Sequence, residues 1–274
     1  MVEFIQVNGV SLCVKRSGSD RAPTVVLSNS LAADMSIWDA QVRELEHSFQ
    51  VVRIDTRGHG GSSAQDGDYK LETLADDVLA VLAAFDIERA HFIGLSLGGI
   101  IGQVLGAREG DRFDSLTLCA TFAETDKGLW ADRADAVRTS GIAPIIDGTI
   151  QRWFTPGFSS SSPKVIDDVS RMIAGTSVNG YAGCAAAIRD MDLTGVPEKI
   201  RVPTLLIAGS EDPSATPEAM KQLQKRIPGA RYAEINDAAH LFTIEKPNEA
   251  TALITDFLQD VQSSAEHVAA NTDY

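Results

Sequence analysis

Cysteine is scarce in this sequence, which has three among 274 residues. Cys13, Cys119 and Cys184 lie far apart, and none belongs to a C-x-x-C pair or to a cluster of cysteine and histidine. An odd number of separated thiols argues against a small disulfide framework, and the spacing argues against the usual zinc sites. We therefore expect reduced thiols in a cytoplasmic protein without a bound metal.

Positive charge and long apolar runs are also lacking. Lysine and arginine number 24 against 38 aspartate and glutamate residues, which gives a formal net charge of -14. Such a chain has little attraction for nucleic acid or for an anionic membrane. No stretch approaches the roughly 18 apolar residues of a membrane span, and the start of the chain lacks the basic region of a secretory signal. These absences favour a cytoplasmic protein that acts on a small molecule.

Hydrophobic residues make up 44% of the chain, enough to bury a large core. Two alternating segments, EFIQVN and VSLCVKR, meet at Asn8-Gly9, a pair typical of a two-residue turn between antiparallel strands. Continuous apolar runs then alternate with helical stretches, which predicts a parallel sheet covered by helices on both faces. The expected strands are 24–30, 50–58, 90–96 and 115–121, and the expected helices are 36–47, 71–85 and 98–108.

The alternation of strands and helices stops between residues 123 and 196. This block contains helical segments and an SSSSP loop at 159–163, and strands resume only at 202–210 and 231–236. Because sheet strands flank the block on both sides, we expect it to be an inserted helical cap. Its expected place is over the carboxyl ends of the strands, where open sheets bind ligands.

The predicted organisation is an α/β core, a cap and a tail. A helix near 247–260 completes the core, and the last dozen residues show no periodicity. The predicted parts are a core of residues 1–122 and 197–262, a cap of residues 123–196 and a C-terminal tail of residues 263–274.

The segment HFIGLSLGGI places Ser96 between Gly94 and Gly98. Ser96 follows a predicted strand and precedes a predicted helix. A strand, a sharp turn and a helix form the context of a nucleophile elbow, in which the flanking glycines let a strained serine fit. We therefore predict that Ser96 is a nucleophile and not merely a serine between glycines.

A serine nucleophile needs a base, and histidine is the usual one. Of the five histidines, His240 in NDAAHLFTIEKP follows the last strand, where the order serine, acid, histidine puts the base. His59, in the glycine-rich RGHGGS loop, is the alternative, although shaping that loop is its plainer role. His240 is therefore the predicted base.

An acid must orient the imidazole and stabilise its charged form. Asp212 in LLIAGSEDPSATP comes just after a strand and is the first choice. Glu211 is adjacent but is expected to point elsewhere, and Asp237 more plainly caps a turn in the loop of His240. Glu124, after the strand SLTLCAT, is the runner-up.

Two N–H donors must hold the oxyanion, one from the residue after the nucleophile and one from the loop after the third strand. Leu97 supplies the first donor. In LSNSLAADMSIW the second donor is Ser30 or Leu31, and the residues alone leave that choice open.

Several stretches together carry a resemblance to a known family. They are LSNSLAADMSIWDAQ, DTRGHGGSS, LADDVLAVLAAFDIERAHFIGLSLGG, GYAGCAAAIRDMDL and VPTLLIAGSEDPSATP. The chain resembles an α/β-hydrolase, and within that superfamily it is similar over nearly its whole length to the 3-oxoadipate enol-lactonases of aromatic catabolism. The resemblance implies a serine hydrolase without metal or organic cofactor, and its triad falls on Ser96, Asp212 and His240.

The same resemblance extends to the residues around the triad. Most relatives have His-Gly where this chain has Asn29-Ser30, and enol-lactonases commonly share the Asn-Ser form. That correspondence makes Leu31 the second oxyanion donor. The chain departs from the family after the histidine, where Leu241-Phe242-Thr243 replaces a short polar continuation such as Ile-Ser-Asn. The site is therefore expected to be more apolar than that of an enol-lactonase.

The enol-lactone carries a carboxylate, so a basic residue of the cap should hold it. Arg133 in LWADRADAVR is the best-matched candidate, although a solvated charge on a helix is its plainer interpretation. Trp130 and Trp153 are expected to line the inner face of the cap, although such aromatic residues more often belong to a core. The other candidate arginines are Arg138, Arg152 and Arg189.

The leading hypothesis is a lactonase or esterase for a small-molecule lactone or ester. 3-Oxoadipate enol-lactone comes first, and a broad carboxylesterase or an N-acyl-homoserine lactonase follows. Cofactor-free haloperoxidases, which make peracids, and receptors that bind a ligand without turnover are the alternatives from other classes. A serine at the elbow argues against haloalkane dehalogenases and epoxide hydrolases, which use aspartate there. The sequence leaves a homo-oligomer open.

Overall fold

The computed structural model describes residues 2–7 and 9–272, with side chains as far as Ser264. Its centre is an eight-stranded sheet with the order β1-β2-β4-β3-β5-β6-β7-β8. The pairs β1–β2 and β2–β4 are antiparallel and the other pairs are parallel, which confirms the predicted fold class. The strands are β1 (Val2–Val7), β2 (Val10–Ser17), β3 (Thr24–Ser28), β4 (Gln50–Ile54), β5 (Ala90–Leu95), β6 (Phe113–Cys119), β7 (Thr204–Gly209) and β8 (Arg231–Ile235).

The central strands are buried on both faces, which explains their continuous apolar runs. Every residue of β3, β4, β5 and β7 is buried, and the register places Val26 beside both Val52 and Phe92. The N-terminal hairpin also forms, with Val7 opposite Val10. Asn8 of its predicted turn lies outside the described residues.

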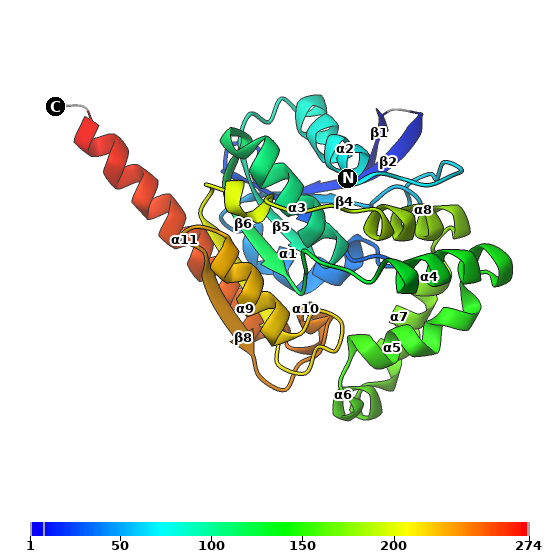
Figure 1. Cartoon of the computed structure of the whole chain (residues 1–274). Helices are drawn as coiled ribbons and strands as arrows, with labels where there is room; N and C mark the ends of the chain where they lie inside the picture. Colours follow the sequence, from blue (N-terminus) through cyan, green and yellow to red (C-terminus); the bar gives the residue numbers. More distant parts are fainter. Residues whose placement is uncertain (1, 8, 273–274) are drawn as a thin grey trace.

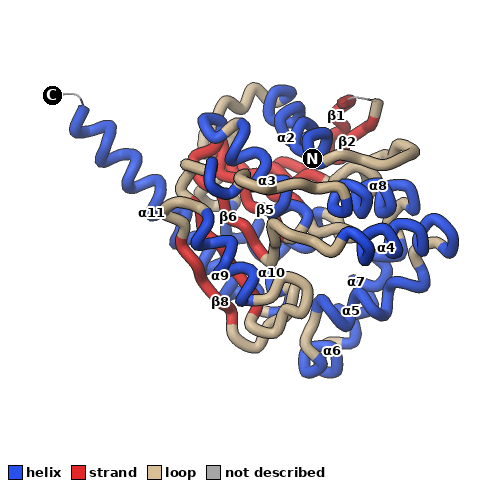
Figure 2. Tube along the Cα trace, viewed as in Figure 1, coloured by secondary structure: helices blue, strands red, loops and turns tan. Residues whose placement is uncertain are grey.

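Helices cover both faces of the sheet (Figures 1 and 2). On one face α2 (Leu71–Ala84) packs against α3 (Leu97–Arg108), and on the other α1 (Asp39–Leu45) packs against α11 (Pro247–Thr272). The remaining helices of this part are α9 (Pro217–Arg226) and α10 (Phe242–Glu245).

Between β6 and β7 the chain forms helices and no strand, and we term residues 123–196, all of them described, the helical segment. Its helices gather beside the sheet (Figure 1). They are α4 (Lys127–Ser140), α5 (Ile146–Trp153), α6 (Pro156–Ser161), α7 (Pro163–Ala174) and α8 (Val178–Arg189).

The serine-rich stretch of the helical segment is not the loop that the sequence predicted. Residues 159–161 complete α6, and α7 begins at Pro163, which leaves only Ser162 between the two helices. Pro156 and Pro163 occupy first helical positions, where proline is favoured, and Thr155 Oγ1 accepts a hydrogen bond from Phe158 N at 3.3 Å. These helix-starting residues outweigh the low helix propensity of serine.

Close backbone contacts bind α8 to the loop after β4. Gly180 lies against Gly58, and a Cβ on Gly180 would come within 2.4 Å of Gly58 Cα. One turn later, Tyr69 N donates to Gly183 O at 3.1 Å. The absence of side chains at these glycines lets α8 approach the loop after β4 closely.

The C-terminal helix is longer than the sequence predicted. α11 continues to Thr272, so residues 263–272 are helical where an irregular tail was expected. The stretch SSAEHVAANT contains three alanines and neither glycine nor proline, so nothing in it ends the helix. Residues 273–274 of the predicted tail lie outside the described residues.

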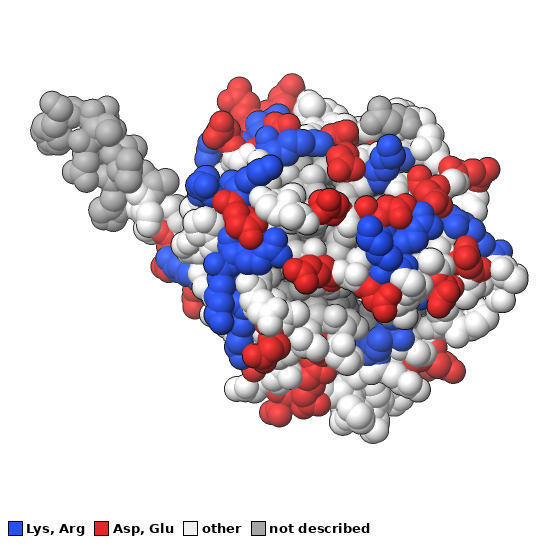
Figure 3. All heavy atoms as spheres, in the orientation of Figure 1, with Lys and Arg blue, Asp and Glu red and all other residues white. Residues whose placement is uncertain are grey.

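The surface carries charges of both signs. On the face drawn in Figure 3, lysine and arginine are interspersed with aspartate and glutamate, without a broad area of either sign. Among the described residues, no helix combines the length and the apolar character needed to cross a membrane.

Replacing Gly180 by alanine should push α8 away from Gly58. Overpacking of this kind costs about 1–3 kcal/mol, so we expect Gly180→Ala to lower the free energy of unfolding, measured in urea, by that amount. Gly157→Ala is the matched control, because Gly157 lies in α6 and an added Cβ would have no neighbour within 4 Å. The control should be neutral or stabilising by up to about 1 kcal/mol. Equal effects of the two substitutions would contradict the close contact.

Candidate active site

Ser96 occupies the turn between β5 and α3. Its backbone has φ 56° and ψ -108°, a conformation that costs energy for a residue with a side chain. A Cβ on Gly94 would lie 2.2 Å from Gly98 O, and a Cβ on Gly98 would lie 2.4 Å from Ser28 O. The glycines of the motif are therefore required by the close approach of the backbone around Ser96.

Hydrogen bonds hold this turn against the neighbouring strands. Ser96 N donates to Cys119 O at 2.8 Å, and Thr121 Oγ1 donates to Ser96 O at 2.9 Å. Gly98 N donates to Asn29 O at 3.0 Å, which ties the start of α3 to the loop after β3. The strained turn is thus fixed from two sides.

His240 and Asp212 come from the loops after β8 and β7. His240 Nδ1 lies 2.7 Å from Asp212 Oδ2, and both residues are buried. Asp212 Oδ1 accepts hydrogen bonds from Ser214 N at 2.7 Å and from Ala215 N at 3.1 Å. Because both carboxylate oxygens are engaged, the carboxylate is held in one orientation toward the imidazole.

The backbones of these two loops are bound to each other. Glu211 N donates to Ala238 O, and Ser210 N donates to Ile235 O, both at 2.9 Å. At the end of β7, a Cβ on Gly209 would come within 2.2 Å of the carbonyl oxygen before His240. The separation of Asp212 and His240 is therefore set by the backbone as well as by their side chains.

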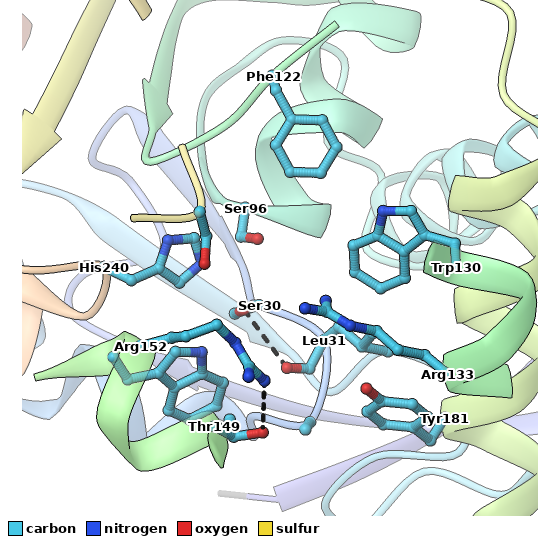
Figure 4. Close-up of a pocket in the computed structure, with 13 residues that line it drawn as sticks. Ser30, Leu31, Ser96, Phe122, Trp130, Arg133, Thr149, Arg152, Tyr181 and His240 are labelled. Atoms are coloured by element: carbon cyan, nitrogen blue, oxygen red, sulfur yellow. Dashed lines mark hydrogen bonds between the residues drawn. The ribbon is translucent and has the colours of Figure 1, made fainter. Parts of the chain in front are cut away.

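The predicted oxyanion donors lie close to Ser96. Leu97 is the first residue of α3, so the helix has no acceptor for its N–H. Leu31 lines the same pocket as Ser96, and Ser30 Oγ donates to Leu31 O at 3.4 Å (Figure 4).

Asn29 and Asp55 shape the loop that carries Leu31. Trp38 Nε1 donates to Asn29 Oδ1 at 3.0 Å, and Met35 N donates to Asp55 Oδ1 at 2.7 Å. Burial raises the pKa of Asp55 to about 6, although backbone N–H donors favour its charged form. Buried side chains thus fix this loop at both ends.

A pocket lies between the carboxyl ends of the strands and the helical segment (Figure 4). The core contributes Ser30, Leu31, Ser96, Phe122, Ser214 and His240 to its lining. The helical segment contributes Trp130, Arg133, Thr149, Arg152, Trp153 and Tyr181. The structure therefore brings Ser96 and His240 into one cavity with the tryptophans and the arginine predicted from the sequence.

The basic side chains of the pocket have no acidic neighbour in its lining. The guanidinium carbon of Arg133 lies 4.6 Å from the centre of the Trp130 ring, and Arg152 Nη2 donates to Thr149 Oγ1 at 3.1 Å. Burial, and then the charge of Arg133, lower the pKa of Arg152. Burial also raises the pKa of Tyr181 on the same wall. An anion in the pocket would offset the repulsion between the two guanidinium groups.

Comparison with known proteins agrees with this geometry. A family model for the alpha/beta hydrolase fold matches residues 23–247. The chain belongs to the α/β-hydrolase family. The match begins just before β3 and ends where α11 starts, so it covers the elbow, both loops of the buried pair and the helical segment of this α/β-hydrolase.

Enol-lactonases are among its relatives. This α/β-hydrolase is 36% identical to 3-oxoadipate enol-lactonase 1 of Acinetobacter baylyi, over 93% of this chain and 95% of the relative. It is 35% identical to 3-oxoadipate enol-lactonase 2 of the same organism, over 89% of this chain and 92% of the relative. The crystal structure of the enol-lactonase from Burkholderia xenovorans LB400 has a TM-score of 0.92 and 40% identity, covering 94% of this chain and 100% of that chain.

The alternative acids of this α/β-hydrolase form no hydrogen bond or ion pair with the imidazole. The side chain of Glu124 is 91% exposed and forms an ion pair with Arg226 at 3.5 Å. Glu211 and Asp237 are exposed, and Asp237 has a φ of 51°, which fits the predicted role in a turn. Asp212 is therefore the carboxylate that contacts His240.

Two of the four candidate arginines do not line the pocket. Arg138 and Arg189 both form ion pairs with Asp68, and Arg189 also pairs with Asp190. These ion pairs agree with the plainer interpretation, in which Arg138 and Arg189 are charges on the surface of a helix. Arg133 and Arg152 are the candidates that line the pocket.

Thr149 and Tyr181 line the pocket but were not predicted from the sequence, and Arg152 was predicted only as a candidate behind Arg133. Thr149 and Arg152 are three residues apart and therefore share one face of α5. Because Trp153 was already predicted to line the cap, this spacing could have pointed to Thr149 and Arg152 as further lining residues. Tyr181 gave no comparable signal, because the face that α8 turns to the pocket depends on its packing.

The alternative base, His59, is packed inside the protein. Its Nδ1 donates to Arg57 O at 3.1 Å, the residue is 1% exposed, and it is not among the residues that line the pocket. Burial lowers the pKa of His59 to about 4. The position matches a histidine that shapes its loop.

His59→Asn should reduce the loss of stability in acid. The folded pKa of about 4 lies below the ordinary value of 6.5, so only the unfolded chain binds this proton between those pH values. The stability contributed by neutral His59 is fully present above pH 6.5 and falls by about 3 kcal/mol as the pH drops to the folded pKa. Asparagine keeps a donor for Arg57 O and does not titrate.

Urea denaturation at pH 6.5 and at pH 4 measures this effect. The decrease in the free energy of unfolding between the two pH values should be about 3 kcal/mol smaller in His59→Asn than in the wild type. Equal decreases in the two proteins would show that His59 titrates normally.

Proposed function

We propose that this chain is a serine hydrolase that opens a small lactone carrying a carboxylate, with 3-oxoadipate enol-lactone as the leading substrate. The observation that carries the proposal is the pocket that Ser96 and His240 share with Arg133 and Arg152 (Figure 4). The identities of 36% and 35% to two 3-oxoadipate enol-lactonases support the choice of substrate.

In the proposed reaction Ser96 Oγ attacks the acyl carbon while His240 takes the hydroxyl proton. Asp212 holds the imidazole through the 2.7 Å contact to Nδ1 and stabilises its charged form. The N–H groups of Leu31 and Leu97 stabilise the oxyanion. The C–O bond of the ring then breaks, and His240 returns the proton to the leaving oxygen. Water, deprotonated by His240, attacks the acyl-enzyme and releases the acid and the free serine.

The substrate carboxylate, in this proposal, binds Arg133 and Arg152. Guanidinium groups match a carboxylate in shape and charge. Trp130 and Trp153, which are 8% and 4% exposed, would form apolar walls for the rest of the ring. Such binding would turn the lactone carbonyl toward Ser96, so the arginines would contribute orientation as well as affinity.

We propose that the helical segment acts as a cap on a core of residues 1–122 and 197–262. Its pocket-lining side chains would cover the reacting atoms and exclude bulk water. We place the activity in the cytoplasm, in the breakdown of aromatic compounds. There the buried thiols of Cys13, Cys119 and Cys184 would stay reduced.

Ser96→Ala tests the nucleophile. With 3-oxoadipate enol-lactone as substrate, we expect kcat to fall by about 10⁴- to 10⁶-fold, and Asp212→Asn to lower it by about 10⁴-fold. Ser30→Ala is the matched control, because Ser30 lines the same pocket and the proposed mechanism does not use its hydroxyl. It should retain kcat within roughly threefold.

A panel of substrates separates the alternatives. The wild type should open the anionic enol-lactone faster than an N-acyl-homoserine lactone or p-nitrophenyl acetate. Turnover by Ser96→Ala at the wild-type rate would refute the serine mechanism. A preference for the neutral esters would refute the proposed substrate.

Arg152→Gln and Arg133→Gln test the carboxylate site. Loss of a hydrogen bond to a charged group should lower kcat/KM for the anionic lactone by about ten- to a hundredfold. A neutral lactone of the same size should change much less. Arg138→Gln is the control, because Arg138 pairs with Asp68 and does not line the pocket. Equal losses on the anionic and the neutral lactone would contradict the assignment.

A further inference from the structure

Glu245 is a buried carboxylate beside the loop of His240. It ends α10 and is 7% exposed. Its hydrogen bonds come from uncharged donors, and among the described residues no lysine, arginine or histidine forms an ion pair with it. A buried carboxylate is costly unless its oxygens are fully hydrogen-bonded, so the donors that it holds indicate its role.

The two oxygens of Glu245 bind two different parts of the chain. Oε2 accepts a hydrogen bond from Ala239 N at 2.8 Å, directly before His240. Oε1 accepts from Thr155 N at 3.1 Å and also from Thr155 Oγ1. Thr155 belongs to the helical segment, between α5 and α6. One carboxylate therefore joins the loop of His240 to the helical segment.

A second connection lies on the other side of His240. Leu241 N donates to Trp153 O at 2.9 Å. The residues before and after His240 are thus both tied to the stretch 153–155, Ala239 through Glu245 and Leu241 directly. Trp153 itself lines the pocket. Hydrogen bonds therefore connect the loop that carries His240 to the part of the pocket wall that contains Trp153.

We propose that Glu245 is a positioning residue, which holds His240 at Ser96 and fixes the Trp153 wall relative to it. The inference rests on the proposed function, because it assigns His240 the role of base. A glutamine at this position has one acceptor oxygen and one NH₂ group. It can satisfy Ala239 N or Thr155, but its NH₂ group then faces the other donor. The backbone before His240 or the start of α6 must shift.

Glu245→Gln should slow the chemical step. A displacement of a catalytic group by a fraction of an ångström to 1 Å can cost up to about a hundredfold in rate. We expect kcat for lactone or p-nitrophenyl acetate hydrolysis to fall about ten- to a hundredfold, with KM changed much less. The rate at which a neutral fluorophosphonate labels Ser96 should fall in parallel, because serine attack on phosphorus, with loss of fluoride, needs the same base.

Two variants of Thr155 separate positioning from general stability. Thr155→Val removes the hydroxyl donor to Glu245 and keeps the backbone donor, so a smaller decrease of kcat and of labelling is expected. Thr155→Ser keeps the hydroxyl and should retain wild-type rates. Thr24→Val is the remote control, because it removes the buried hydrogen bond from Thr24 Oγ1 to Gln50 Oε1 at the amino end of β3. It should lower the melting temperature without slowing labelling.

The outcomes distinguish the two proposals. Folded Glu245→Gln protein that labels and turns over at wild-type rates would overturn the positioning role, as would equal slowing by Thr155→Ser and Thr155→Val. Rapid labelling of the wild type without lactone hydrolysis would refute the proposed substrate, and the labelling rate of Glu245→Gln would still decide the role of Glu245. A wild type that resists the fluorophosphonate would overturn both.

Discussion

The backbone conformation of Ser96 is the constraint on which the candidate site depends. A residue with a side chain holds φ 56° here because Gly94, Gly98 and Ser28 bring their backbones into contact beneath it. The same contact includes the hydrogen bond from Gly98 N to Asn29 O, which places the loop after β3 beside the first turn of α3. Of the predicted oxyanion donors, Leu97 therefore follows the serine at the start of α3, and Leu31 lines the same pocket as the serine.

The sequence was informative where local pattern and sheet topology decide the structure. Buried parallel strands read as apolar runs, and their carboxyl ends share one edge, so residues that follow them, such as Ser96, Asp212 and His240, could be expected to meet. The face that each helix of residues 123–196 turns inward depends on packing against other helices, which a local sequence pattern does not reveal. For that reason Tyr181 was missed and Arg152 was ranked second. The ends of helices were also hard to predict from the sequence. Residues 263–272 continue α11, and most of the serine-rich stretch 159–163 is helical.

The arginines of the pocket differ from those of the surface in their neighbours. The chain has a net charge of -14, and surface arginines such as Arg138 and Arg189 are paired with aspartate. Arg133 and Arg152 line a pocket without an acidic residue. Because salt screens exposed charges over about 10 Å, the surface carboxylates would affect an anion inside the pocket less than these two guanidinium groups do. The net negative charge of the chain is therefore compatible with the anionic substrate that we propose.

Two of the contacts that hold the helical segment have different consequences. The Gly58 and Gly180 contact fixes α8, against which α4 packs with Trp130 and Arg133. The Glu245 contact fixes the end of α5, which carries Arg152 and Trp153, and it acts through the backbone next to His240. A substrate that binds to Arg152 and Trp153 would thus be held by residues that are connected by hydrogen bonds to the loop of the base. Since reaction requires alignment to within a fraction of an ångström, a rigid connection from the α5 wall to the imidazole would turn binding of the distant carboxylate into orientation at Ser96.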